Sequence, residues 1–373
     1  MPSGVEWAFR FASEVCRNPA ASISRWKSLS GRMAAGCVPI YLPEEILHAA
    51  GMLPVTVWGN EYSPSSPRGD ASQGCSLAGA VISAIRSGKW REIDVWAFPS
   101  TCTTFRNALE VIFPGENERL RFPFVFPDSA DNPGAVEHML DRVEAFCEWA
   151  GRVSGREVSE GSLDRSVRTY NENRKSFILL EERMAESPGS FSGSEFATFA
   201  RAGMALPKEV HTRVLAEALS RLRAPPRTAP PRVFLAGMMP TGSVMEALDG
   251  AGAAIVGNDL ALGHRYYSGS PDVAGDIPLS IARRHLRRES CPTVHGSGQG
   301  CIETLFQGIV ACGADRLILL HGNGCEPESG YVADIAAESR ERGIPFLCLD
   351  AGPQAVEGEV PKARIGTFLD RGE

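Results

Sequence analysis

The sequence has no long hydrophobic run, and no unbroken apolar stretch approaches the roughly eighteen residues of a membrane span. Hydrophobic residues nevertheless make up 43% of the chain and charged residues 22%, which is typical of a soluble globular protein. The amino-terminal residues lack a basic region followed by an apolar core, so the sequence offers no secretory signal. We therefore expect a cytoplasmic protein that does not engage membranes.

Runs of lysine and arginine are also missing, and the net charge is -7. Nucleic-acid surfaces need clustered cations to neutralise phosphates, so we expect no nucleic-acid partner. Residues 236–243, Ala-Gly-Met-Met-Pro-Thr-Gly-Ser, could present helix amides to an anion. They lack both the dinucleotide-binding fingerprint and the phosphate-loop lysine, so we expect no NAD site and no ATP site in this chain.

Cysteines spaced two or three residues apart, the usual sign of a local metal site, are absent as well. The chain has ten cysteines, and in a long cytoplasmic protein such a number favours metal ligation or redox chemistry over a disulfide framework. Any metal site must therefore be assembled from separate loops, whose proximity depends on the fold.

Short apolar strands alternate with amphipathic helices in both halves of the chain, a pattern typical of parallel sheets covered by helices. In the first half we expect helical structure over 5–35, a helix from Pro43 to Gly51, strands at 53–58, 95–98 and 122–126, and helices at 75–87 and 133–150. In the second half we expect strands at 233–236, 253–256, 316–320 and 345–349, and helices at 244–251, 302–310 and 331–341.

Two changes of composition divide the chain. Residues 162–222 have the periodicity of long helices, and the Pro-rich stretch 224–231 follows them. We predict N-terminal helices with a first α/β domain over 1–160, a helical connection over 161–223, and a second α/β domain over 224–373. The expected fold class is α/β, with two doubly wound, Rossmann- or flavodoxin-like parallel-sheet domains and additional helices at the N-terminus and in the middle.

Three cysteines occupy comparable places in this pattern. Cys102 lies in the loop beyond the strand 95–98, which we expect to stop at Pro99 and to leave Ser100 in the loop. Cys325 lies beyond the strand 316–320, and Cys75 opens a helix, where the helix dipole favours a thiolate. We predict that the three thiols hold one metal centre between the two domains. The alternative is that they are ordinary cysteines near loops.

The remaining cysteines and two histidines carry weaker signals. Cys37 is expected to be a buried small thiol or to line a cavity. The core thiols are expected to be Cys16, Cys147, Cys312 and Cys348, and the reserve ligands Cys291 and Cys301 on either side of a Gly-rich segment. His295 and His321 are possible neutral ligands, although a structural histidine is the more common case.

Seven stretches together resemble a known family and follow one another in its order. They are 41–55 (Tyr-Leu-Pro-Glu-Glu-Ile-Leu-His-Ala-Ala-Gly-Met-Leu-Pro-Val), Cys75-Ser, Phe98-Pro-Ser-Thr-Cys102, 236–242, Gly263-His-Arg-Tyr-Tyr267, Cys291-Pro-Thr and Cys325-Glu-Pro327. On these stretches the chain resembles the subunits of 2-hydroxyacyl-CoA dehydratases and benzoyl-CoA reductases, which include double-cubane cluster proteins. The resemblance covers most of the chain.

The resemblance implies an oxygen-sensitive 4Fe-4S cluster held by Cys75, Cys102 and Cys325, with the fourth iron open to an oxygen ligand; a double-cubane cluster is the variant. It also implies that Glu45 is an acid/base group, whereas complementing a helix dipole is the alternative. Ser100, beside Cys102, is expected to bond a cluster sulfur or the substrate, or else to cap the loop. Arg106 and Arg265, beside matched motifs, are the expected anchors for coenzyme A.

The implied activity is radical dehydration of a 2-hydroxyacyl-CoA thioester. A separate ATP-dependent iron-sulfur activator would supply the electron, and a related second subunit or a second copy of the chain would complete a dimer. Alternatives are a reductase of aromatic acyl-CoA or of another small molecule, a non-catalytic electron-relay or binding subunit, and a structural zinc protein. Where the family commonly has aspartate after two of its cysteines, this chain has Thr103 and Glu326, so the acyl group stays open.

Overall fold

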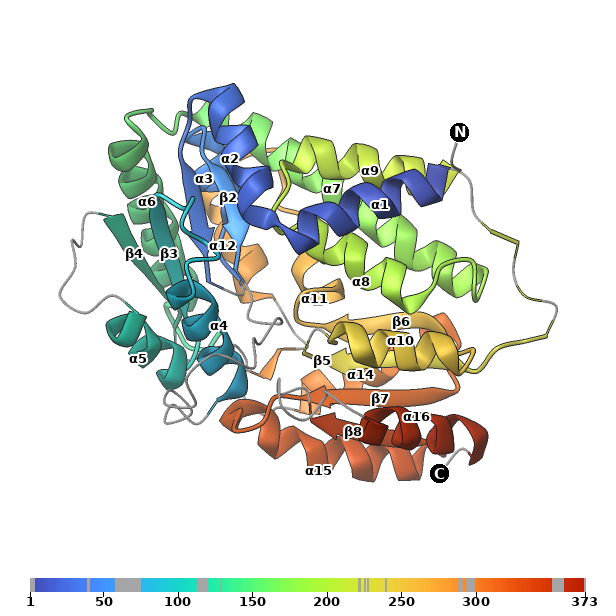
Figure 1. Cartoon of the computed structure of the whole chain (residues 1–373). Helices are drawn as coiled ribbons and strands as arrows, with labels where there is room; N and C mark the ends of the chain where they lie inside the picture. The colour runs from blue at the N-terminus through green and yellow to red at the C-terminus, as the bar shows by residue number, and fades with distance from the viewer. Residues whose placement is uncertain are drawn as a thin grey trace.

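The computed structural model describes residues 4–38, 41–57, 75–112, 120–127, 129–220, 223–224, 226, 228–238, 240–287, 291–292, 299–350 and 359–371. Within these ranges the chain forms two four-stranded parallel sheets with helices on both faces. Figure 1 shows the sheet of the first half at the left and that of the second half at the lower right. The prediction of an α/β fold with two parallel-sheet domains is therefore confirmed.

The first sheet has the order β2-β1-β3-β4 and helices on both faces. Its strands are β1 (Ala34–Cys37), β2 (Leu53–Thr56), β3 (Val95–Ser100) and β4 (Arg121–Val125), and its helices are α3 (Glu44–Ala49), α4 (Ser76–Arg86), α5 (Thr103–Ile112) and α6 (Ala135–Ser154). Val95 and Ala97 share a core with α3 and α6, whereas Trp96 and Phe98 share one with α4 and α5. This alternation follows from the two-residue period of a strand.

The expectation of helical structure over 5–35 is wrong at its end. Helices α1 (Gly4–Arg17) and α2 (Pro19–Ser30) form as expected, but Ala34–Cys37 is a central strand. A side chain on Gly36 would place its Cβ 2.5 Å from the Trp96 ring. The strand is built from small residues because a large aromatic ring covers it. Small residues have low strand propensity, so the sequence alone did not predict this strand.

Strand β3 also runs further than expected, through Pro99 to Ser100. On one side of β3, pairing with β1 ends at Ala97, whose carbonyl accepts from Val38 N–H; on the other side, β4 pairs as far as Ser100. Because alternate residues of a strand point to the same neighbour, Pro99 faces the side where β1 has ended. The missing N–H of proline therefore costs no ladder hydrogen bond there.

The second sheet repeats the plan in the order β6-β5-β7-β8. Its strands are β5 (Arg232–Gly237), β6 (Ala254–Leu260), β7 (Arg316–His321) and β8 (Phe346–Asp350), and its helices are α10 (Gly242–Gly250), α14 (Gln299–Cys312), α15 (Glu326–Glu341) and α16 (Glu359–Arg371). Gly237 ends β5 with φ 92°, and a Cβ there would lie 2.3 Å from the Leu320 carbonyl oxygen. Only glycine fits this close crossing of two backbones.

Long helices fill the middle of the chain, as predicted. They are α7 (Glu160–Glu186), α8 (Gly193–Ala202) and α9 (Lys208–Ser220), and α1 packs against α8 and α9 (Figure 1). Two short helices of the second half, α11 (His264–Tyr267) and α12 (Ile277–Leu286), lie between β6 and α14 in sequence. α12 packs against α6, so the second half of the chain returns to cover the first sheet. The division at 160 and 224 stays a prediction.

His211, fully buried in α9, ties the middle helices together. Its Nε2–H donates to the Phe199 carbonyl at 3.0 Å, and Asn173 Nδ2 lies 3.0 Å from its Nδ1. Burial, reinforced by the charge of Lys208, lowers the pKa of His211 from 6.5 to about 3. The folded protein therefore keeps this imidazole neutral under conditions in which the unfolded chain protonates it.

We expect the stabilising contribution of His211 to be complete above pH 6.5 and to be lost as the pH falls toward 3. Because only the unfolded imidazole takes up a proton in this window, the free energy of unfolding should fall by up to about 1.4 kcal/mol per pH unit. Urea unfolding at pH 7 and pH 5 measures this fall. In His211→Gln the fall should be smaller; in His138→Gln, which alters an exposed histidine, it should match the wild type. Equal falls in all three proteins would contradict the assignment.

None of the described helices is both long enough and apolar enough to cross a membrane.

Candidate functional site

The three predicted ligand cysteines each stand immediately before a helix. Cys75 is the N-cap of α4 and Cys325 the N-cap of α15, while Cys102 directly precedes α5. The free N–H groups and the positive dipole end of a helix favour an anion at this position. These thiols are therefore placed where a thiolate is stabilised.

The starts of α4 and α15 meet, which joins the two halves of the molecule. The Ser76 N–H donates to the Asn323 carbonyl at 2.8 Å, and the Cys325 thiol hydrogen-bonds the Cys75 sulfur. This hydrogen bond lowers the pKa of Cys75 to about 6, whereas the bond to Cys75, burial and the charge of Glu328 raise the pKa of Cys325. The pair therefore favours a thiolate on Cys75 and a thiol on Cys325.

Cys102 borders the same apolar cluster, half-buried against the core that includes Cys75, Phe98 and Cys325. Among the described residues, no three His, Cys, Asp or Glu side chains are grouped closely enough to hold a metal ion. The structure thus brings Cys75 and Cys325 together and leaves Cys102 at the edge of their cluster. The donor set of soft thiolates in apolar surroundings suits an iron-sulfur cluster, and the ligand assignment stays a prediction.

His321 ends strand β7 beside this pair. Its Nδ1 lies 3.4 Å from Glu328 Oε2, and the same carboxylate oxygen accepts from the Gly322 N–H at 3.0 Å. Hydrogen bonding to Glu328 raises the pKa of His321. The Glu328 carboxylate lies between this imidazole and the Gly322 N–H, an arrangement that favours a structural role in fixing the loop before Cys325.

Glu45 lies in the interior, in an ion pair with Arg174 of α7. It is 1% exposed, and its Oε2 is buried without a hydrogen-bond partner. Burial opposes ionisation, but the charges of Arg174 and Arg284 outweigh it and lower the pKa of Glu45 to about 2. Such a carboxylate is a weak base, and its role in proton transfer stays a prediction.

Glu44 is held even more completely. Its carboxylate accepts from the Tyr266 hydroxyl at 2.6 Å and from Thr56, and Lys208 Nζ lies 3.4 Å away. The cavity between Glu44 and Glu45 has a volume of about 10 Å³, room for about one water molecule. The two glutamates therefore do more than complement the dipole of α3, because they anchor it to helices from the middle and the second half of the chain.

The predicted coenzyme A anchors have different surroundings. Arg265 is 8% exposed and its guanidinium forms two hydrogen bonds to Asp259 of β6, at 2.9 and 2.7 Å. This bidentate pairing occupies the two parallel N–H donors with which the guanidinium would otherwise bind a phosphate. The side chain of Arg106, in α5, lies outside the described residues.

The other cysteines are all accounted for in the described part of the chain, and none of the ten forms a disulfide. Cys37 is buried in β1, in the core beneath α3. Cys16, Cys147, Cys312 and Cys348 lie half-buried in α1, α6, α14 and β8, where they pack against apolar cores as expected. Cys291 and Cys301 are buried, and Cys301 hydrogen-bonds Tyr331. His295 lies outside the described residues.

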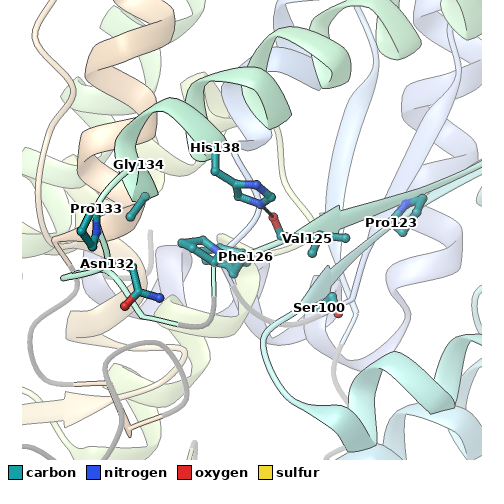
Figure 2. Close-up of a pocket in the computed structure, with 10 residues that line it drawn as sticks. Ser100, Pro123, Val125, Phe126, Asn132, Pro133, Gly134 and His138 are labelled. Carbon is teal, nitrogen blue, oxygen red and sulfur yellow. Dashed lines mark hydrogen bonds between the residues drawn. The ribbon is translucent and has the colours of Figure 1, made fainter.

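A pocket of about 630 Å³ lies at the carboxyl ends of β3 and β4. Figure 2 shows Ser100 at the end of β3, Val125 beside it at the end of β4, Phe126 just beyond, and His138 above them on α6. The His138 Nε2 lies 3.2 Å from the Val125 carbonyl oxygen. Sequence reasoning identified Ser100 but missed Val125 and His138. The rule that ligands gather at the carboxyl ends of parallel strands was the signal that pointed there.

Comparison with known proteins covers nearly the whole chain. The family model "2-hydroxyglutaryl-CoA dehydratase, D-component" matches residues 39–371. One subunit of the benzoyl-CoA reductase of Thauera aromatica is 25% identical over 93% of this chain and 92% of its own length. The (R)-phenyllactyl-CoA dehydratase beta subunit of Clostridium sporogenes is 23% identical over 97% and 98%, and the lactoyl-CoA dehydratase beta subunit of Anaerotignum propionicum is 24% identical over 99% of both chains.

Proposed function

The chain belongs to the 2-hydroxyglutaryl-CoA dehydratase D-component family, and we propose that it is the iron-sulfur subunit of a 2-hydroxyacyl-CoA dehydratase. The observation that carries the proposal is the contact between Cys75 and Cys325, each at the start of a helix from a different half of the molecule. Thiols from distant parts of the chain meet at the edge where parallel sheets bind ligands. Two full-length relatives are beta subunits of dehydratases that act on CoA thioesters.

Cys75, Cys102 and Cys325 would hold a 4Fe-4S cluster, or one half of a double-cubane cluster. When bound, the cluster supplies electrons at low potential to the substrate. The chain's own residues lower the cost of placing thiolates there, because each thiol faces the positive end of a helix. Apolar neighbours such as Phe98 and Phe105 keep water from the sulfurs.

The dehydratase would work with other proteins. Because the relatives are named as subunits, we infer that this chain pairs with a related subunit or with a second copy of itself. A separate ATP-dependent iron-sulfur activator would deliver the electron, as the family resemblance implies. The cytoplasm is the compartment that suits ten free thiols.

Reduction of an aromatic acyl-CoA is the second candidate, and the match to the benzoyl-CoA reductase of Thauera aromatica over 93% of the chain favours it. The two reactions differ in their products. A dehydratase releases water and leaves an unsaturated acyl-CoA, whereas a reductase adds electrons and protons to the ring. Mass spectrometry of the acyl-CoA product therefore distinguishes them.

We expect anaerobically purified protein to contain about four iron and four acid-labile sulfide per chain, and to dehydrate a 2-hydroxyacyl-CoA when given ATP, reductant and activator. Metal analysis, a visible spectrum and product analysis measure this. If the metal is zinc and not iron, the alternative of a structural zinc protein is supported. Iron without turnover, when only a co-purified partner protein binds the acyl-CoA, would support the relay role instead.

A further inference from the structure

We propose that the pocket at the ends of β3 and β4 binds the acyl group of the CoA thioester and selects an uncharged acyl group over one with a second carboxylate. The proposal rests on the proposed function and deepens it, because it names the kind of acyl group that the site accepts. The pocket would hold only the acyl group of the thioester. Its walls include Ser100, Val125, Phe126, Asn132 and His138.

The pocket begins beside one of the proposed cluster ligands. Ser100 and Val125 are register partners on adjacent parallel strands, and Ser100 precedes Cys102 by two residues. Two residues of extended chain span at most about 7 Å, so the wall formed by Ser100 lies close to the loop of Cys102. An acyl group in the pocket would thus have its thioester end directed at the place where the cysteines gather.

The size of the pocket fits a small organic group. Its volume of about 630 Å³ lies within the range of roughly 300–1,000 Å³ that is usual for small-molecule sites. Phe126 and Ala135 form buried apolar walls, and Val125, Pro127 and Pro133 add further apolar surface. Contact with these walls removes apolar acyl surface from water, which favours binding.

The charge of the pocket supplies the selectivity. Among the described residues that line it there is no lysine or arginine, and the polar side chains are Ser100, Asn132 and His138. A second carboxylate would lose water here without gaining a cation, which is costly. The three polar side chains suit a hydroxyl group instead.

The tautomer of His138 supports this reading. A carbonyl oxygen only accepts, so the Nε2 that lies 3.2 Å from the Val125 oxygen must carry the proton. In the neutral ring Nδ1 is then an acceptor. In that tautomer the ring can accept the hydrogen bond of a substrate hydroxyl group through Nδ1.

The test measures the affinity of three probes by calorimetry: phenyllactyl-CoA, 2-hydroxyglutaryl-CoA and free coenzyme A. The protein is purified anaerobically with any subunit that accompanies it. We expect the wild type to bind phenyllactyl-CoA at least about tenfold more tightly than 2-hydroxyglutaryl-CoA, a difference of about 1.4 kcal/mol. Equal or reversed affinities would overturn the selectivity.

Two substitutions test the location. Val125→Trp should narrow the pocket and weaken phenyllactyl-CoA binding at least about tenfold without changing the binding of free coenzyme A, whereas Leu29→Trp, on the exposed face of α2, should bind like the wild type. Asn132→Arg adds a cation at an exposed position and should raise the affinity for 2-hydroxyglutaryl-CoA. Gln307→Arg, at an exposed site on α14, should not.

The outcomes separate the two proposals. If Val125→Trp folds and binds phenyllactyl-CoA like Leu29→Trp, the acyl pocket lies elsewhere. If Val125→Trp does not fold, Asn132→Arg decides, because an unchanged preference in that variant overturns the proposal. If the wild type binds neither acyl-CoA more tightly than free coenzyme A, the proposed dehydratase function itself fails.

Discussion

Anaerobically purified Cys75→Ser protein is expected to lose most of its iron and at least about 100-fold of its activity. This loss exceeds the roughly 10–100-fold typical of substitutions at residues that only hydrogen-bond to a metal ligand. The reason is the contact between the two helix starts. Cys75 has a pKa near 6, so it supplies a thiolate at neutral pH, and a serine hydroxyl in its place stays protonated. Iron and acid-labile sulfide per chain are the measurement.

Cys102→Ser and Cys325→Ser are expected to give the same result, because each thiol stands immediately before a helix in the same cluster. Cys16→Ser and Cys147→Ser are the matched controls, since these thiols lie half-buried within α1 and α6. They should keep the iron content of the wild type. If all three site variants do so as well, these cysteines are not the ligands and the thioester chemistry loses its support.

The second large effect concerns stability. Arg174→Met is expected to lower the free energy of unfolding by about 3–5 kcal/mol, because it leaves the Glu45 carboxylate charged, buried and without its partner. Urea unfolding measures this loss. The double variant with Glu45→Gln should recover most of it, since removing both charges avoids burying either one alone.

An exposed pair on the same helix provides the control. Arg168 of α7 pairs with Asp164 four residues earlier, and the two side chains are 61% and 30% exposed. Arg168→Met should therefore cost much less stability than Arg174→Met. If the two arginine variants lose the same stability, the buried pair has no special role in holding α3 to α7.

The pH dependence of Glu45 has a definite sign. Its folded pKa of about 2 lies below the ordinary value of 4.5, so its contribution is complete above pH 4.5 and is lost as the pH falls toward 2. Glu45→Gln should flatten the acid limb of the stability curve. If that variant is stable at neutral pH yet inactive, Glu45 acts in the chemistry; if it is active, the residue is structural.

Much of the fold follows from the sequence alone. Apolar runs of four to six residues between helical segments predict parallel strands, and the strands at 95–100, 232–237 and 316–321 lie where these runs are. The carboxyl ends of parallel strands share one edge of a sheet, so a cysteine after each strand predicts convergence. Cys102 and Cys325 follow strands in this way, whereas Cys75 opens a helix, and the contact that forms is the one between Cys75 and Cys325. Local pattern suffices here because both the strand and its exit loop are encoded in neighbouring residues.

The tertiary structure decided the rest. Gly36 belongs to a central strand only because Trp96 covers it, and Pro99 continues a strand only because β1 has already ended. Glu45 is an ion-pair partner because α7, more than a hundred residues later in the chain, brings Arg174 to it.

The pocket beside Ser100 likewise needs β4 and the start of α6 to close around it. Contacts between residues that are distant in the chain depend on how the layers pack, and one sequence carries no local signal for that packing. The positions of most strands and the candidate thiols could therefore be predicted from the sequence. The order of the strands in each sheet, the partners of each buried charge and the shape of the cavity were fixed only when the helices and sheets came together.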